Sequence, residues 1–561
     1  MRKFAVDIKY FKIKIVSIIL LLLLSTIINL IQPLLTQYIM DAGIYKADTY
    51  IVIKYSVISI GLYLILYAIG LVKEGIRISI KNDLNLNLWR RAINHISLAK
   101  LDKINEKNCV ELTHCIESDI STITSVFDEG AMLAITEVLG IIGGIIGLFI
   151  VSNDLAIIIL LITPIKLVGT IFMSKENMKL MQQLMQHRQM FSKWIGEYIT
   201  GIEDIRLWGI QKKLHSVFEK IKQEELTSVS KRNIFNYLNI SIDQLFIEIV
   251  IVVIYILGCH VYKNGNISVG GIIAYITFST YILTPLSSIF NIFFIYAGVK
   301  PSLERLGTFL NWEKECNEGK LALEKIEEIR FDNVSFAYDN NRELFQQINL
   351  NIKENQKIIL FGKNGSGKTT INRLLLRLFD PSEGHIYINN IEIKELELKK
   401  YREKISVMNT DFYLFNDSIY NNICIERNID EAFWDEIIKI CGLEETIDEK
   451  KLSYKIGENG ELLSAGQRQK IALARALACG RELLILDEPT ANMDYDSKRK
   501  FISKIMDRNF RKTVIIISHD IESLKKADNI IYLSEGQVSD IGSYEEIFNR
   551  NEKFRTEIAT L

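Results

Sequence analysis

Residues 357–379 read KIILFGKNGSGKTTINRLLLRLF. An apolar run leads straight into a glycine-rich loop, and a helix-forming run follows the loop. In this order of strand, loop and helix, the glycines let the backbone approach phosphate groups, and the loop N–H groups and the helix N-terminus favour a bound anion. We therefore predict a P-loop, whose nucleotide-binding residues are Gly362, Lys363, Asn364, Gly365, Ser366, Gly367, Lys368, Thr369 and Thr370.

Two side chains of this loop have separate predicted roles. Lys368 supplies a cation to the β- and γ-phosphates of ATP, and the hydroxyl of Thr369 is a ligand for Mg²⁺. ATP and Mg²⁺ are therefore the expected cofactors of the chain.

Two later apolar runs end in candidate metal-binding and catalytic residues. LLILD ends in Asp487, which we expect to hold Mg²⁺ through water at the carboxyl edge of an open α/β sheet. Glu488 follows at once and can polarise the attacking water as general base. VIIIS is followed by His519, which can reach a γ-phosphate. Without a P-loop, an acid or a histidine at a strand end would more often be structural.

The first 300 residues hold most of the long apolar runs. A spanning helix needs about 20 mainly apolar residues. The first run is too long for a signal peptide and ends in no small-residue cleavage site, so we expect it to stay as a membrane anchor. The six predicted spans are 15–40, 55–72, 131–153, 155–174, 245–262 and 267–299.

Short links and long polar segments alternate between these spans. The long segments, 73–130 and 175–244, carry basic clusters and lie on the same side as the basic N-terminus. By the positive-inside rule that side is the cytoplasm, and the C-terminal half follows the sixth span there. The long segments also show helical periodicity, so we expect the helices of this cytoplasmic-membrane protein to extend far into the cytoplasm.

Five residues interrupt the apolar runs. Glu137 and Glu248 should face the bundle interior or a cavity, either as a substrate or proton contact or as an interhelical hydrogen bond. We expect Lys166 to extend its ammonium group toward the membrane surface. Pro164 and Pro285 are interpreted as packing kinks.

The composition argues against one class of partner. The chain has 561 residues and a formal net charge of −1, so it has no overall basic field to attract nucleic acid. The seven cysteines are scattered and form no CxxC pair, so we expect reduced, structural thiols.

With the segment LLSAGQRQ at 462–469 added to the motifs above, the chain resembles ATP-binding cassette transporters of the exporter type. The resemblance covers essentially the whole chain and implies a half-transporter. The implied fold is an all-α transmembrane domain of six helices, followed by an α/β P-loop (RecA-like) nucleotide-binding domain with an antiparallel β subdomain and a helical signature subdomain. We predict a transmembrane domain at 1–305, a linker at 306–325 and the nucleotide-binding domain at 326–561.

The resemblance also assigns residues outside the P-loop. In the family, the LSAGQ-type signature caps the γ-phosphate of the ATP held by the opposing subunit, so Ser464, Gly466 and Gln467 would act in trans. Tyr338 matches the aromatic residue that stacks on adenine, and Asp494 matches the loop that links the two ATP sites.

Two positions depart from the family pattern. The family normally places a glutamine where this chain has Thr410, next to Asn409, and that glutamine touches Mg²⁺ and the attacking water. A hydroxyl is shorter than a carboxamide, so we expect the metal contact to be lost or mediated by water, and a heterodimer with unequal sites becomes more plausible. The second departure, Ala465 in place of a glycine, adds only a methyl group.

The expected function is ATP-driven export of a lipid, peptide or hydrophobic compound by alternating access. The expected partners are a second half-transporter, identical or not, and the lipid bilayer. Two alternatives stay open: a membrane-embedded ATPase that acts as a sensor or regulator, and an importer with the same architecture.

Overall fold

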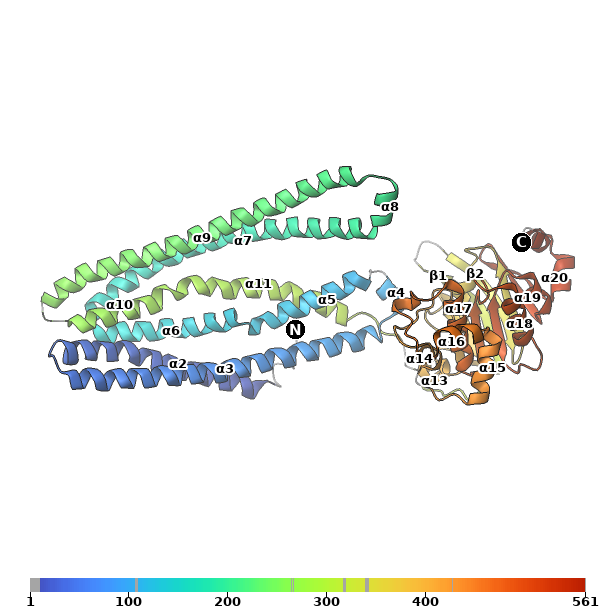
Figure 1. Cartoon of the computed structure of the whole chain (residues 1–561), viewed down its shortest axis with the longest axis horizontal. Coiled ribbons are helices and arrows are strands. Elements are labelled where there is room, and N and C mark those ends of the chain that lie inside the picture. The colour runs from blue at the N-terminus through green and yellow to red at the C-terminus, as the bar shows by residue number, and fades with distance from the viewer. Residues whose placement is uncertain are drawn as a thin grey trace. The chain divides into compact units, whose positions relative to one another are not determined.

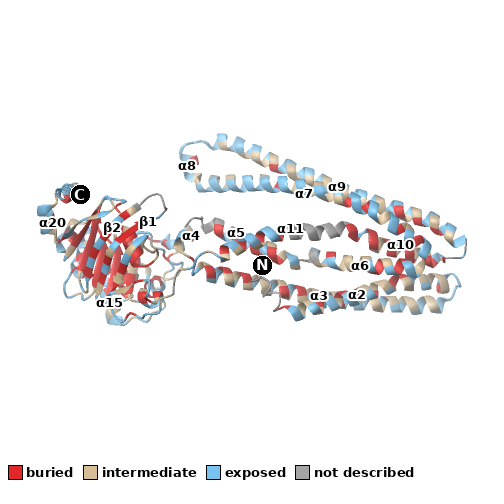
Figure 2. Cartoon of the chain, turned by 180° about the vertical axis from the view of Figure 1, so that it is seen from behind, coloured by how far each residue is buried: buried red, intermediate tan, exposed pale blue. Residues whose placement is uncertain are grey.

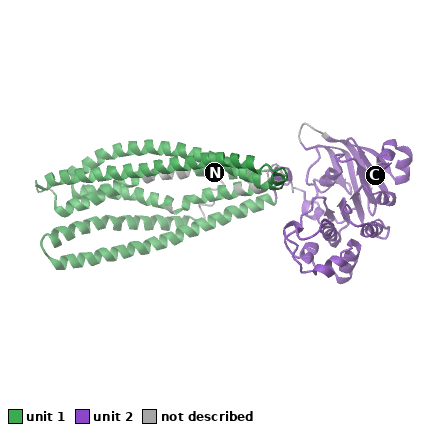
Figure 3. Ribbon diagram, turned by 45° about the horizontal axis from the view of Figure 1, so that its top comes forward, with its two compact units in different colours: residues 1–97, 106–312 green, residues 98–105, 313–561 purple. Residues whose placement is uncertain are grey.

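The computed structural model describes residues 11–105, 109–263, 265, 267–315, 319–338, 343–425 and 427–559. It divides into two compact units (Figure 3). The helical unit comprises residues 1–97 and 106–312, and the α/β unit comprises residues 98–105 and 313–561. The domain boundaries predicted from the sequence, with a linker at 306–325, stay a prediction.

Long helices make up the helical unit (Figure 1). They are α2 (Lys12–Tyr38), η1 (Ile39–Ile44), α3 (Thr49–Ile96), α5 (Cys109–Thr124), η2 (Ser125–Phe127), α6 (Glu129–Val151), α7 (Asn153–Thr200), α8 (Ile202–Leu207), α9 (Gln211–Lys263), α10 (Val269–Leu283) and α11 (Pro285–Leu310).

Within the described residues, five helical segments are long and apolar enough to cross a membrane: Lys12–Ile44, Thr49–Ile96, Cys115–Val151, Asn153–Thr200 and Gln211–Lys263. The sixth predicted span, 267–299, is not one continuous helix. It is divided at Thr284 because Pro285 has no N–H with which to continue the helical hydrogen bonds of the backbone. α10 alone has 15 residues, so the count of six spans stays a prediction.

The helices continue well beyond their apolar segments, as the periodicity predicts. α7 has 48 residues and α9 has 53. At about 1.5 Å per residue they are roughly 70 and 80 Å long, whereas the hydrocarbon core of a bilayer is about 30 Å thick. The two helices lie side by side in Figures 1 and 2, and each carries many exposed residues outside its apolar part.

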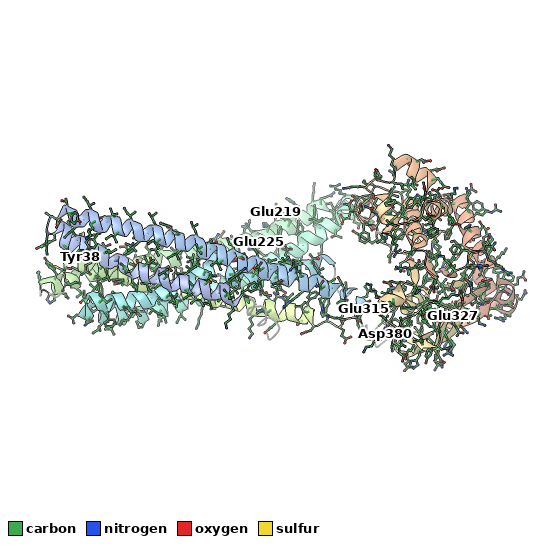
Figure 4. The ribbon with its side chains drawn as sticks, turned by 90° about the horizontal axis from the view of Figure 1, so that it is seen from below. Tyr38, Glu219, Glu225, Glu315, Glu327 and Asp380 are labelled. Carbon is green, nitrogen blue, oxygen red and sulfur yellow. The ribbon has the colours of Figure 1, made fainter. Side chains whose placement is uncertain are left out.

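Where α7 and α9 lie together, a buried acid is neutralised by its neighbours. Glu225 of α9, labelled in Figure 4, is almost fully buried. Its carboxylate lies 2.7 Å from the ammonium group of Lys222 and 3.7 Å from the guanidinium group of Arg188 on α7. The pair with Arg188 joins the two helices, whereas the pair with Lys222 lies within α9.

One expectation for the intramembrane residues is wrong. Lys166 does not extend toward the surface: it is buried, its Nζ donates to the backbone oxygen of Leu283 at 2.7 Å, and Asp243 lies 3.7 Å away. Glu248 is exposed within this chain, because α9 buries the face that carries Val250 and Ile254, so its position facing a cavity stays a prediction.

The remaining three residues within the apolar runs are one acid and two prolines. Glu137 of α6 is half-buried, and its Oε2 has no hydrogen-bond partner among the described residues. α7 continues through Pro164. The helix interruption before Pro285 lies where a kink is predicted.

Two sheets form the α/β unit. The antiparallel sheet has the order β2-β1-β4-β5, and the larger sheet has the order β10-β9-β3-β8-β7-β6. The larger sheet is parallel except for β10, which pairs antiparallel with β9. The strands are β1 (Glu328–Ala337), β2 (Glu343–Lys353), β3 (Lys357–Gly362), β4 (Glu383–Ile388), β5 (Ile391–Glu392), β6 (Ile405–Met408), β7 (Leu483–Asp487), β8 (Thr513–Ile517), β9 (Asn529–Ser534) and β10 (Gln537–Gly542).

The helices of the α/β unit are α4 (Leu101–Asn105), α12 (Lys368–Leu375), α13 (Leu398–Arg402), α14 (Ile419–Cys424), α15 (Glu431–Cys441), α16 (Glu444–Lys450), η3 (Glu458–Gly460), α17 (Ala465–Ala478), α18 (Tyr495–Ile505), α19 (Ile521–Lys526), α20 (Tyr544–Arg550) and α21 (Glu552–Ala559). Among them, the group from α14 to α17 forms the predicted helical subdomain around the signature.

The core of the α/β unit lies on both faces of the larger sheet. Every residue of β3, β7 and β8 is buried, which agrees with their apolar sequences, and Figure 2 shows the buried strands in red. Cys424 and Cys441 lie in this core, and burial raises the pKa of both thiols. These two cysteines are therefore structural, as predicted.

Candidate nucleotide-binding site

Four neighbouring parallel strands place the predicted site residues at one edge of the larger sheet. β3 pairs with β8, β8 with β7, and β7 with β6. Because the carboxyl ends of parallel strands meet at the same edge, the segments that follow them lie together. Those segments are the P-loop after β3, His519 after β8, Asp487 and Glu488 at the end of β7, and Thr410 after β6.

The P-loop has the backbone that its glycines predict. Gly365 and Gly367 have φ values of 82° and 97°, in the left-handed region that glycine favours. A Cβ atom at Gly367 would also lie 2.0 Å from the Phe345 ring. The loop is therefore held in a conformation that only glycine fits, and α12 begins immediately after it at Lys368.

Lys368 folds back over the loop. Its Nζ donates to the backbone oxygens of Gly362 at 2.6 Å and Lys363 at 3.0 Å. Burial lowers the pKa of Lys368, while the carboxylates of Glu488 and Asp487 act in the opposite direction. The ammonium group is thus placed at the loop and faces the carboxylates at the end of β7.

Two hydroxyl groups converge on Asp487. Thr369 Oγ1 donates to Asp487 Oδ2 at 3.0 Å, and the side chain of Thr410 lies near the same carboxylate. Burial raises the pKa of Asp487, and the two hydroxyl groups partly oppose this rise. Thr410, which replaces the usual glutamine, therefore lies beside Asp487.

Glu488 and His519 lie beside this group. Glu488 has a φ of 47°, which is uncommon for a residue with a side chain, and its N–H donates to Ile517 O at 3.0 Å. His519 packs edge-on against Phe361 at 5.6 Å between ring centroids. Burial and then the nearby Lys368 lower the pKa of His519, which keeps its imidazole neutral near neutral pH.

Tyr338 is anchored at its hydroxyl and exposed at its ring. Its Oη lies 2.8 Å from Thr370 Oγ1 and accepts from Arg373 Nη1 at 3.2 Å. Phe336 and Phe379 pack edge-on against the ring at 4.9 and 5.4 Å between centroids. Nearly half of the residue (48%) remains exposed, so a planar group has access to it.

Most of these residues line one cavity of about 310 Å³. Gly362, Lys363, Ser366 and His519 border the site without lining the cavity. The lining residues are Tyr338, Leu344, Asn364, Gly365, Gly367, Lys368, Thr369, Thr370, Thr410, Asp487, Glu488 and Ile517.

The donor set of this cavity fits a magnesium nucleotide. Ser366 Oγ and His519 Nε2 are buried without a hydrogen-bond partner among the described residues. The hydroxyl of Thr369 and the carboxylate of Asp487 are oxygen ligands of the kind that Mg²⁺ prefers, and they already lie in contact.

The signature residues are not among those that line this cavity. Ser464 and Gln467 form a reciprocal cap at the start of α17: Gln467 N donates to Ser464 Oγ at 3.2 Å, and Ser464 N donates to Gln467 Oε1 at 3.0 Å. A Cβ atom at Gly466 would lie 2.7 Å from the backbone oxygen of Asn492. The sequence predicts that these residues act on another chain's nucleotide, and in the part of the chain that the structure describes they do not line their own chain's P-loop cavity.

Asp494 lies at the start of α18 rather than in the cavity. It caps that helix by accepting from Ser497 N at 2.8 Å, and Lys470 Nζ lies 3.2 Å from its other oxygen. The hydrogen bonds from Ser497, together with Lys470, lower the pKa of Asp494 to about 2.

Two residues of the site make contacts that the sequence does not predict. Arg373 donates to the hydroxyl of Tyr338, and Gln469 of α17 bonds to the backbone of Glu488. Each contact joins residues far apart in the sequence, and although Gln469 ends the LLSAGQRQ segment, that motif assigns it no contact with Glu488.

The fold of the α/β unit and the residues at its sheet edge define the class: a P-loop nucleotide-binding protein whose chain also carries helices able to cross a membrane. Residues 15–286 match the family model described as "ABC transporter transmembrane region", and residues 345–491 match the one described as "ABC transporter". The chain belongs to the ABC transporter family.

Several relatives align over nearly the whole chain. An ATP-dependent lipid A-core flippase of Pectobacterium atrosepticum is 26% identical, with 94% of this chain and 91% of the relative covered. A putative export ATP-binding/permease protein of Rickettsia bellii is 28% identical, with 96% and 94% covered. The solved structure of a bacterial Atm1-family ABC exporter with ATP bound matches with a TM-score of 0.81 at 19% identity, over 98% of each chain, and therefore shares the fold.

Proposed function

We propose that this chain is one half of a dimeric transporter that hydrolyses ATP to export a substrate across the cytoplasmic membrane. The observation that carries the proposal is the meeting of P-loop, Asp487, Glu488 and His519 at one sheet edge, in a chain that also carries spanning helices. The relatives named as a flippase and as an export permease support export over import or regulation.

Each side chain at the edge has a role in hydrolysis. The loop N–H groups and Lys368 bind the phosphates, and the ring of Tyr338 packs on the adenine. Glu488, at the end of β7, accepts the proton of the attacking water. His519, held neutral, donates a hydrogen bond to the γ-phosphate. Thr369 and Asp487 would hold Mg²⁺, which when bound neutralises part of the phosphate charge.

A second chain completes each site. Because Ser464, Gly466 and Gln467 do not line this chain's own cavity, we infer that they cap the γ-phosphate of an ATP held by the partner, with Asp494 beside them at the start of α18. The capped N-terminus of α17 presents N–H groups that suit an anion. The partner is an identical chain or a related half-transporter.

The transported substrate is expected to be amphipathic. Many large apolar side chains of the helical unit are exposed, as a surface against lipid requires. The flippases among the relatives are named for a lipid substrate. We therefore propose a lipid as the transported substrate in preference to a peptide or another hydrophobic compound. The α/β unit faces the cytoplasm in this proposal.

Reconstitution into vesicles tests the transport function. Inside-out vesicles that contain the full chain should move a fluorescent phospholipid analogue away from the outer leaflet when Mg²⁺ and ATP are added, and the lipid should stimulate ATP hydrolysis. Vesicles with the Glu488→Gln variant serve as the matched control. Movement in the reverse direction would favour an importer. ATP hydrolysis without movement of lipids, peptides or hydrophobic dyes would favour the regulator.

Replacing Thr410 by valine tests the metal site. Valine keeps the shape of threonine but removes the hydroxyl beside Asp487, whose interaction with the carboxylate lowers the Asp487 pKa. Its loss raises the pKa further, so more of the carboxyl group is protonated at a given pH. Because one hydrogen bond contributes about 1 kcal/mol, we expect a roughly fivefold higher Mg²⁺ requirement and an acid limb of activity moved to higher pH.

Titrations of ATPase activity with Mg²⁺, repeated from acidic to neutral pH, would measure both changes. Thr556→Val is the matched control, because the Thr556 hydroxyl is also hydrogen-bonded, to the backbone of α21, but lies outside the cavity. The same Mg²⁺ requirement in both variants and the wild type would mean that Thr410 does not support Asp487.

A further inference from the structure

One buried amide joins the signature helix to the backbone of the proposed catalytic base. Gln469 lies in α17 and is only 3% exposed. Its Nε2 donates to the backbone oxygen of Glu488 at 2.8 Å, and its Oε1 accepts from the backbone N–H of Asn492 at 2.8 Å. Both polar ends of the side chain are thus satisfied by the turn that follows β7.

This turn begins with a residue in an unusual conformation. Glu488 has a φ of 47°, and a non-glycine residue is held there only when its surroundings determine its backbone. Inside the turn, the bond from Ala491 N to Glu488 O is long, at 3.4 Å, and the bond from Met493 N to Thr490 O is 3.3 Å. The shorter bond from Gln469 Nε2 therefore does more to fix the carbonyl of Glu488 than the turn's own bond from Ala491 does.

The first turn of α17 touches the same segment. A Cβ atom at Gly466 would lie 2.7 Å from the oxygen of Asn492, so the helix backbone approaches the turn closely. Ser464 caps the same helix five residues before Gln469. The start of α17 and the amide of Gln469 therefore both contact the short segment that begins at Glu488.

We propose that Gln469 is a positioning residue that sets the backbone of Glu488 and makes its placement depend on the signature helix. The inference rests on the proposed function, in which Ser464 meets the partner's nucleotide while Glu488 serves the nucleotide of its own chain. ATP captured by one site then places the catalytic carboxylate of the other site. The two sites communicate through Gln469 within each chain.

Two variants of the full-length protein separate this role from simple packing. Gln469→Met keeps the length of the side chain and loses both hydrogen bonds. Gln469→Glu keeps an acceptor for Asn492 N and loses the donor to Glu488 O. Because a small misplacement of a catalytic group costs up to about a hundredfold in rate, we expect kcat for ATP to fall roughly 10- to 100-fold in both variants. The KM for ATP should stay unchanged, because the P-loop contacts remain.

The rate is expressed per bound nucleotide, measured with a fluorescent ATP analogue, so that a loss of folded protein does not imitate a loss of kcat. Gln356→Met is the matched control: the Gln356 amide also accepts a backbone N–H, from Lys353 at 2.9 Å, but it lies outside the cavity. Wild-type kcat per bound nucleotide in both Gln469 variants would overturn the inference while leaving the proposed function intact. A wild-type protein that binds ATP without hydrolysing it would overturn both.

Discussion

Replacing Glu488 by glutamine is expected to lower steady-state ATP hydrolysis by about 10²- to 10⁴-fold, the usual contribution of a general base. The amide cannot accept the proton of the attacking water, but it has nearly the same size and remains at the end of β7. ATP binding should be preserved, because Lys368 and the P-loop backbone are unchanged. Phosphate release and binding of a fluorescent ATP analogue measure the two properties separately.

Glu535→Gln is a matched control for this experiment. Glu535 also follows a strand, β9, and has a φ of 52°, but it is highly exposed and does not line the nucleotide cavity. Its variant should hydrolyse ATP at the wild-type rate. Turnover in the Glu488→Gln protein within tenfold of the wild type would assign the base to another group.

Replacing Lys368 by alanine is expected to act on binding rather than on the chemical step alone. Hydrogen bonds to a charged group contribute about 1.5–3 kcal/mol, which corresponds to a roughly 10- to 150-fold weaker affinity for ATP. In the structure the ammonium group donates to the carbonyl oxygens of Gly362 and Lys363, which places it at the loop. Isothermal titration with ATP and with AMP measures the effect.

AMP distinguishes the proposed contact from a general loss of structure. The lysine is assigned to the β- and γ-phosphates, so affinity for AMP should change little in the Lys368→Ala protein. Lys553→Ala removes an exposed lysine at α21 and should leave both affinities unchanged. Equal losses for ATP and AMP in the Lys368 variant would show that the loop, rather than the charge, had been disturbed.

The sequence predicts much of this site because its signals are local. The P-loop requires glycine at Gly365 and Gly367 for backbone reasons, and a short apolar run such as LLILD favours a strand buried on both faces, as the structure shows for β7. Because β7 and β8 are parallel neighbours, their carboxyl ends lie at the same edge of the sheet. The positions of Asp487 and His519 at that edge therefore follow from the strand assignments alone.

The contacts that the sequence does not predict depend on distant segments. Gln469 meets Glu488 only because α17 packs beside the turn after β7. Lys166 is buried because α7, α9 and the end of α10 meet around it, and its sequence neighbours alone suggest a side chain that reaches for the surface. The division of the last apolar run at Pro285 is local, but whether the two parts count as one span depends on the bilayer around them.

The hydrogen bond from Lys166 to the carbonyl of Leu283 restrains the joint between α10 and α11. An interruption of a helix beside a proline is a natural hinge, because the proline has no N–H to donate to the preceding turn. Here the ammonium group of Lys166, on a third helix, bonds to the last residue of α10, and flexing the hinge would cost this hydrogen bond and leave the more distant Asp243 as the counterion. A change in the bundle that keeps this bond carries α7 and the end of α10 together.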